Sequence, residues 1–251
     1  MNVNKIKNSR GEDTLEVIYN GFKGSAPGGK SKGLYEVKDF KESIDKEIEL
    51  LKELGETIGS IGIDTFEDFE RISNYTSKLG ASAKTALEFA ILNSRGGYKF
   101  LEGRKLPRPL GNVIGGGMHF KDSSLDFQEF LTIPYKAKTF EDAVSVNLKF
   151  HKFIQEKLQK LDKGFKDTKT DEGAWSPTLN NEEVLKLLKK YSKKFKLKIG
   201  IDMAASSFFK DNLYKYKDKE LTKDEQIDYV NSLIKKYDLY YVEDPLHQDD
   251  F

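Results

Sequence analysis

Two short apolar segments in the second half of the chain each end on a carboxylate. Residues 196–202 (KLKIGID) end on Asp202, and residues 239–244 (LYYVED) reach Glu243 where their apolar run stops. The amphipathic stretch between them predicts the order strand, helix, strand. In parallel barrels and doubly wound sheets, the carboxyl ends of the strands carry the chemistry. We therefore expect Asp202 and Glu243 to face one pocket.

A pair of acids in this position suits a hard cation. Neighbouring strands lie about 4.8 Å apart, so both carboxylates can bind a single Mg²⁺ ion through oxygen. Taken alone, acids that end two strands serve equally well as helix caps or turn formers. The spacing by itself leaves these alternatives open.

The composition is that of a chain with a substantial hydrophobic core. Hydrophobic residues make up 37% and charged residues 33%, and the net charge is +1. This balance gives no field that would attract nucleic acid or an anionic membrane. The absence of cysteine excludes disulfides and thiolate metal sites. No apolar run approaches the roughly 20 residues of a membrane helix, and the amino terminus lacks a signal core, so we expect a soluble, cytoplasmic protein.

The order of the predicted elements divides the chain into two domains. A hairpin over 3–7 and 14–19 and a third strand after Asn20-Gly21 are followed by three helices, the pattern of a small α+β domain. The Gly/Pro/Arg segment 103–109 marks the boundary, which gives domains 1–106 and 107–251. The second domain has the α/β order strand, strand, helix, helix, strand, helix, strand (ββααβαβ).

Seven motifs along the chain match, in order, those of one family. They are NSRGEDTLEV (8–17), SAPGGKSKGLYE (25–36), NVIGGGMH (112–119), FQEFLTIP (127–134), TDEGAWSP (170–177), KIGIDMAASSFF (198–209) and YVEDPLHQDDF (241–251). The chain thereby resembles the N-terminal half of enolase, the glycolytic lyase that interconverts 2-phosphoglycerate and phosphoenolpyruvate. The resemblance implies a three-stranded antiparallel sheet with helices, followed by half of an enolase-type (β/α)8 barrel. In that barrel the second strand runs antiparallel, which brings Glu129 to the same face as Asp202 and Glu243.

The resemblance also implies roles for individual residues. Asp202 and Glu243 match Mg²⁺ ligands, and Ser31, in the loop 25–33, matches the ligand of a second Mg²⁺. Glu172 matches the general acid that protonates the leaving hydroxide, and Glu129 its partner acid. Gln128, Glu129 and His119 match substrate contacts, and His119 lies near the leaving group. Without the family motifs, Glu172 would be an ordinary loop acid, His119 a structural histidine and the loop 25–33 a turn.

Part of the enolase site has no counterpart in this sequence. The resemblance implies a third carboxylate ligand, a lysine base, a second lysine and an Arg-Ser pair for the phosphate, all on later strands. Lys198 cannot replace the base, because it precedes Asp202 by four strand residues and lies roughly 13 Å away at the other end. We therefore expect a separate C-terminal enolase chain to complete the site, giving a split, hetero-oligomeric enzyme. The alternatives are a non-catalytic enolase-like scaffold or binding protein and an inactive fragment.

Overall fold

The computed structural model describes two compact units, Met1–Lys105 and Leu106–Phe251. It describes all residues except 30–31, 102–105, 121–122 and 251. Each unit has a hydrophobic core of its own, so each is a structural domain in its own right. In the described part of the chain, no helix is both long and apolar enough to cross a membrane.

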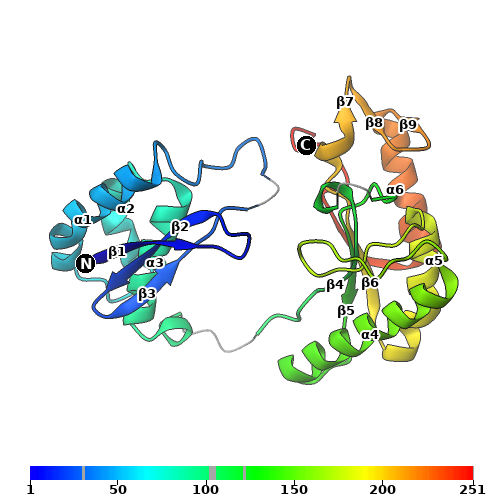
Figure 1. Ribbon diagram of the computed structural model, residues 1–251, viewed down its shortest axis with the longest axis horizontal. Helices are drawn as coiled ribbons and strands as arrows, with labels where there is room; N and C mark the ends of the chain where they lie inside the picture. The colour runs from blue at the N-terminus through cyan, green and yellow to red at the C-terminus, as the bar shows by residue number, and fades with distance from the viewer. Residues whose placement is uncertain (30–31, 102–105, 121–122, 251) are drawn as a thin grey trace. The chain divides into compact units, whose positions relative to one another are not determined.

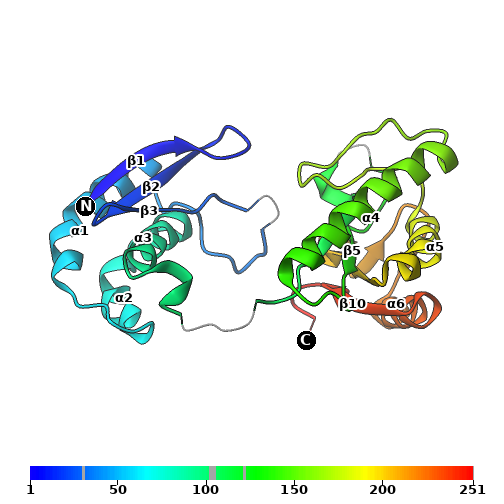
Figure 2. The same ribbon diagram turned by 90° about the horizontal axis from the view of Figure 1, so that it is seen from below.

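The first unit is an antiparallel sheet with helices on one of its faces (Figures 1 and 2). Its strands, in the order β1-β2-β3, are Asn2–Lys7, Asp13–Tyr19 and Phe22–Ser25. Its helices are α1 (Ile44–Ser60), α2 (Glu70–Thr76) and α3 (Ala81–Ser94), with short 3-10 turns η1 (Glu67–Phe69) and η2 (Gly97–Lys99). Helix α3 packs closely on β3 because Gly24 has no side chain. A Cβ atom there would lie 2.2 Å from the Ala86 carbonyl oxygen.

The second unit is built on a four-stranded open sheet in the order β10-β6-β5-β4. The strands are β4 (Gly111–Gly115), β5 (Glu129–Ile133), β6 (Lys198–Asp202) and β10 (Leu239–Glu243). Strands β6 and β10 are parallel, whereas β5 runs antiparallel to both β4 and β6. The predicted mixture of α/β and α+β units and the antiparallel second strand are thus present in the structure.

Three long helices cover one face of this sheet (Figure 2). They are α4 (Phe140–Leu161), α5 (Asn181–Ser192) and α6 (Lys223–Tyr237), and each begins at a side-chain N-cap, Thr139, Asn180 or Thr222. Phe130, Ile199 and Ile201 of the strands belong to the core beneath these helices. Because side chains alternate along a strand, Glu129 and Asp202 are directed to the opposite face of the sheet.

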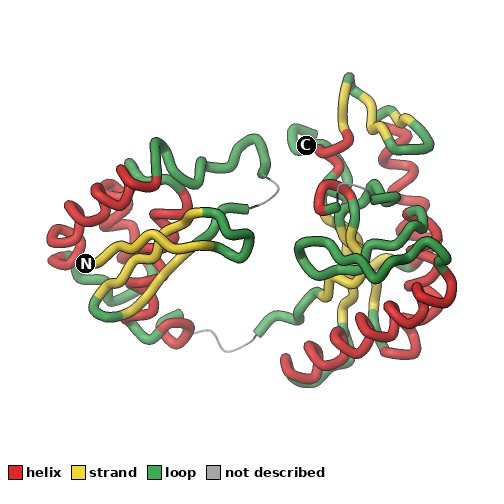
Figure 3. Tube along the Cα trace, viewed as in Figure 1, coloured by secondary structure: helices red, strands yellow, loops and turns green. Residues whose placement is uncertain are grey.

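Short elements complete the second unit. A small antiparallel sheet precedes α6 and consists of β7 (Phe209–Lys210), β8 (Leu213–Lys215) and β9 (Glu220–Leu221). The 3-10 turns are η3 (Gly117–His119), η4 (Lys193–Phe195) and η5 (Ala205–Phe208). A long loop connects α4 to α5 and contains Glu172 (Figure 3).

Candidate active site

Three acids occupy one line across the sheet of the second unit. Glu129 on β5 is the register partner of Asp202 on β6, and Asp202 is in turn the partner of Glu243 on β10. Register partners on adjacent strands place their side chains on the same face. We call Glu129, Asp202 and Glu243 the carboxylate row. The antiparallel direction of β5 produces it, because the start of that strand meets the ends of its neighbours.

Glu172 extends this acidic group beyond β5. Its carboxyl hydrogen-bonds to that of Glu129, so the two side chains meet directly. Burial, together with Glu172, Asp202 and Glu243 nearby, raises the pKa of Glu129 to about 8. The carboxyl group of Glu129 therefore holds a proton at neutral pH, next to the side chain of Glu172.

The loop that carries Glu172 is a small hairpin attached to the edge of the sheet. We call residues 168–176 the acid hairpin. Within it, Thr170 N donates to Ala174 O at 2.8 Å, and Gly173 N donates to Thr170 O at 3.0 Å. Trp175 bonds β4 in both directions, donating to Val113 O and accepting from Gly115 N, each at 3.0 Å. The exposed tip, Asp171 and Glu172, is therefore connected to a base that is fixed at Trp175.

Two features of β4 fit the acid hairpin. Asn112 Nδ2 donates to Glu172 Oε2 at 3.1 Å, which directs the carboxylate. Gly115 leaves the space under the hairpin, since a Cβ atom there would lie 2.9 Å from Thr170 Cγ2 and 3.1 Å from Ala174 Cβ. Strand β4 thus both supports the hairpin and orients its acid.

Asp202 is buried and held by hydrogen bonds on both carboxylate oxygens. Ala204 N donates to Oδ1 at 2.9 Å, and Gln128 Nε2 donates to Oδ2 at 3.2 Å. The backbone of Gln128 also donates to Asp202 O at 3.1 Å. Gln128, expected to contact substrate, thus lies against Asp202 in this structure.

Glu243 is exposed at the open edge of the sheet and has a neighbour of its own. The hydroxyl of Tyr241 donates to Glu243 Oε2 at 2.8 Å. Tyr241 is the register partner of Gly200, where a Cβ atom would lie 2.8 Å from that of Tyr241. Gly200 therefore makes room for the ring that orients Glu243.

The donor set of Asp202 and Glu243 fits a hard divalent cation. Both are carboxylates, the ligand type that Mg²⁺ prefers, and they lie on adjacent strands in register. Among the described residues, no group of three or more His, Asp or Glu side chains could hold a metal ion. These residues therefore supply two ligands and require others to complete the coordination.

Two predicted site residues cannot be located, and Lys198 lies away from the carboxylate row. Ser31 and the side chain of His119 lie outside the described residues. Lys198 pairs with Asp238 at 3.2 Å, on β6 but four residues from Asp202. It is thus engaged at the opposite end of the strand from the carboxylate row.

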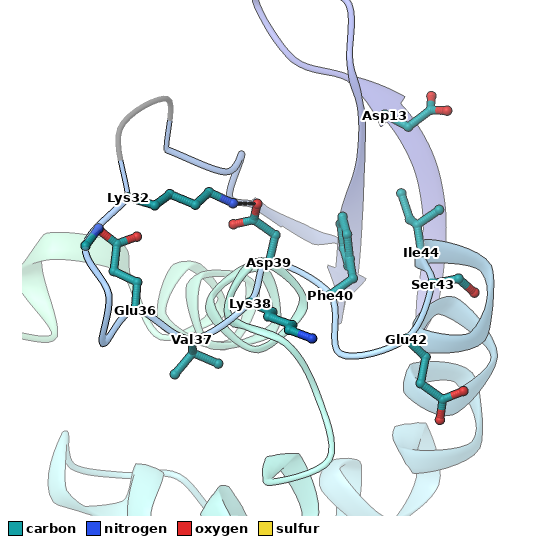
Figure 4. A pocket seen from close by; sticks show the side chains of 11 residues that line it. Asp13, Lys32, Glu36, Val37, Lys38, Asp39, Phe40, Glu42, Ser43 and Ile44 are labelled. Atoms are coloured by element: carbon teal, nitrogen blue, oxygen red, sulfur yellow. Dashed lines mark hydrogen bonds and ion pairs between the residues drawn. The ribbon is translucent and has the colours of Figure 1, made fainter. Parts of the chain in front are cut away.

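The first unit contains a separate cavity of about 490 Å³, bordered by the segment 32–40 and the start of α1 (Figure 4). Several of its polar side chains are already engaged with one another or with the backbone. Lys32 pairs with Asp39, as the dashed line shows, and Glu36 accepts from the backbone of Gly33 at 3.0 Å. It offers no convergent set of acids comparable with the carboxylate row.

Sequence reasoning missed three contributors to the site, namely Asn112, Tyr241 and His151. His151 lies on α4, and its Nε2 is 3.0 Å from Gly173 O in the acid hairpin. A signal existed for Tyr241 alone, because residues two apart on a strand face the same side. Asn112 and His151 reach the hairpin across 60 and 22 residues of sequence, which no local pattern records.

Comparisons with known proteins show the family of the chain. A family model described as "Enolase, C-terminal TIM barrel domain" matches residues 104–251. The enolase of Methanothermobacter thermautotrophicus is 36% identical, over 99% of this chain and 67% of the relative. The enolases of Methanosphaera stadtmanae and Pyrobaculum aerophilum are 35% and 32% identical, over 98% and 99% of this chain and 67% and 68% of the relatives. The chain spans about two thirds of the length of these relatives, and it belongs to the enolase family.

Proposed function

We propose that this chain forms the metal-ligand and acid part of an enolase active site. The completed protein would be a Mg²⁺-dependent hydro-lyase that interconverts 2-phosphoglycerate and phosphoenolpyruvate. The observation that carries the proposal is the carboxylate row with Glu172 bonded to Glu129 at its side. The two expected Mg²⁺ ligands, Asp202 and Glu243, thus lie on the same face of the sheet as Glu129 and its hydrogen-bonded partner Glu172, an arrangement that would suit a dehydration.

The reaction demands two kinds of help, and the residues divide accordingly. Removing a proton next to a carboxylate accumulates negative charge, which Mg²⁺ held by Asp202 and Glu243 would offset. The leaving hydroxide needs a proton, which Glu172 would donate with Glu129 as its hydrogen-bonded partner acid. Asn112 keeps the Glu172 carboxylate directed toward β5, and Gln128 keeps Asp202 in place.

We further propose that a separate C-terminal enolase chain supplies the base and the third carboxylate ligand. Its strands would pair with β10, where Tyr240 is 68% exposed and Glu243 is also exposed. An exposed strand edge of this kind is a template for another strand. Adding strands there would extend the carboxylate row beyond Glu243, next to the two ligands already present.

The test is reconstitution. The purified chain is mixed with a polypeptide that contains the complementary enolase strands, and phosphoenolpyruvate formation is followed with and without Mg²⁺. We expect activity from the mixture and none from this chain alone. Activity of the pure chain, or a stable but inactive complex, would overturn the proposal.

The native protein tests the two-chain arrangement separately. A 1:1 hetero-pair, or a multiple of it, purified from the source organism would support a separate chain. A single longer polypeptide containing this sequence would overturn that part and leave the proposed chemistry standing. Homo-oligomers without hydratase activity would instead indicate the non-catalytic scaffold.

A further inference from the structure

The acid hairpin is held by a contact from helix α4 as well as by strand β4. His151 projects from α4, a helix of 22 residues, to the carbonyl oxygen of Gly173, the residue next to Glu172. A carbonyl can only accept, so the Nε2 atom of His151 carries the proton in this 3.0 Å contact. The hydrogen bond therefore fixes the peptide from which the Glu172 side chain extends.

A second contact returns from the hairpin to the same histidine. Trp175 Nε1 donates to His151 O at 3.0 Å, and the two rings stack with centroids 4.9 Å apart at 29°. Lys169 Nζ lies 4.3 Å from the Trp175 ring centroid, and Phe165 meets that ring edge-on. The Trp175 side chain is therefore fixed by stacking and charge contacts, and it connects the hairpin base to the helix.

These contacts hold different parts of the acid hairpin. The stack and the indole bond hold the base of the hairpin, which the β4 hydrogen bonds already anchor. The bond to Gly173 O reaches the tip, where Asp171 and Glu172 are exposed. Within the hairpin itself, the Gly173 backbone donates only to Thr170 O. The tip thus depends on His151 more than the base does.

We propose that His151 is a positioning residue for the acid Glu172. It would fix the backbone at Gly173 from α4, while Asn112 directs the carboxylate from β4. The inference rests on the proposed function in assigning the acid role to Glu172. The bond itself and its effect on the hairpin stand independently of that role.

Two variants separate this role from mere packing. His151→Phe keeps a flat ring against Trp175 but removes the donor. His151→Gln loses the ring but places an N–H donor where Nε2 lies. Lys152→Gln, at the exposed neighbouring position on α4, is the matched control. If His151 only filled space, the Phe variant would be the milder of the two.

The first measurement uses this chain and needs no activity. Amide hydrogen exchange is followed over the acid hairpin in the original protein and the three variants. We expect faster exchange in residues 170–174 for H151F, and near-normal exchange for H151Q and K152Q. The fluorescence of Trp175, the only tryptophan in the sequence, checks that the base of the hairpin stays in place. Unchanged exchange in H151F, or equal effects of H151F and H151Q, would overturn the proposal.

The second measurement uses the reconstituted enzyme. Losing one hydrogen bond of typical net strength, about 1 kcal/mol, corresponds to about a fivefold fall in rate. We expect kcat to fall by about that factor in H151F, with KM and the Mg²⁺ requirement unchanged and with most of kcat restored in H151Q. A loss confined to KM would contradict the positioning role. If the unmodified mixture is inactive, the proposed function fails, and the exchange experiment still decides the contact.

Discussion

Glu129 and Asp202 face each other as register partners on antiparallel strands, although 73 positions separate their numbers in the sequence. In a purely parallel sheet, Glu129 at the start of its strand would lie at the opposite end from Asp202. The reversed direction of β5 therefore creates the acidic group. It also places Glu129, with Glu172 hydrogen-bonded to it, on one side of Asp202 and the exposed Glu243 on the other.

Replacing either expected metal ligand should abolish the Mg²⁺-dependent reaction. Asp202→Asn and Glu243→Gln keep the side-chain size and remove the negative charge. Because changing even a residue that only hydrogen-bonds a metal ligand costs about 10–100-fold at metal sites, we expect these variants to lose at least about 100-fold in activity. Activity and calorimetric Mg²⁺ binding are measured on the reconstituted protein. Asp238→Asn, which removes the partner of Lys198, serves as control and should leave Mg²⁺ binding intact.

Removing the Tyr241 hydroxyl should weaken Mg²⁺ binding without destroying the site. Tyr241→Phe deletes the donor to Glu243 Oε2, so the carboxylate loses its orientation. We expect the Mg²⁺ concentration for half-maximal activity to rise by about tenfold. This is the lower end of the effects seen when a residue that hydrogen-bonds a metal ligand is changed. Tyr75→Phe, at an exposed tyrosine of the first unit, should have no effect. Equal behaviour of the two variants would show that the hydroxyl contact is incidental.

Glu129 should make the second unit less stable as the pH rises. Its pKa is raised to about 8 in the folded protein, from an ordinary value of 4.5. Between these values the folded state binds more protons than the unfolded state, so the free energy of unfolding decreases with increasing pH. Urea denaturation between about pH 5 and about pH 9, without divalent ions and followed by Trp175 fluorescence, measures this slope.

The slope assigned to Glu129 has its own control. Glu129→Gln removes the titrating group and should flatten the dependence of stability on pH. Glu156→Gln, at an exposed position on α4, should leave the slope unchanged. An unchanged slope in the Glu129 variant would show that another group causes the pH dependence.

A methyl group at Gly115 should displace the acid hairpin. In Gly115→Ala the added Cβ meets Thr170 Cγ2 at 2.9 Å, and overpacking of this kind costs about 1–3 kcal/mol. The change should cost less when combined with Thr170→Ser, which removes that methyl group. Denaturation of the two single variants and the double variant gives the coupling between the sites. Simple additivity would contradict the predicted clash.

The sequence was informative where chemistry coincides with the end of an element. Asp202 and Glu243 stand out because an apolar strand stops at each, and the strand order places them side by side. The position of Glu129 depended on knowing that β5 is reversed, which came from the enolase resemblance and not from periodicity. The architecture of the second unit followed from the same order of strands and helices.

The rest of the site depends on tertiary contacts that local patterns do not encode. The proton affinity of Glu129 comes from burial and three neighbouring acids, whereas Glu172, which the motif emphasises, is exposed. Asn112 and His151 act through hydrogen bonds to a hairpin far from them in sequence. Such partners become visible only when the chain is folded.

The pairing of Trp175 with β4 affects how readily the protein self-associates when the acid hairpin is loosened. The acid hairpin covers the outer edge of β4, an edge that would otherwise offer free backbone groups to a second molecule. The hairpin that carries Glu172 therefore also protects this edge from pairing with a second molecule. Variants that loosen it, such as Gly115→Ala, should precipitate on warming before the core of the second unit melts.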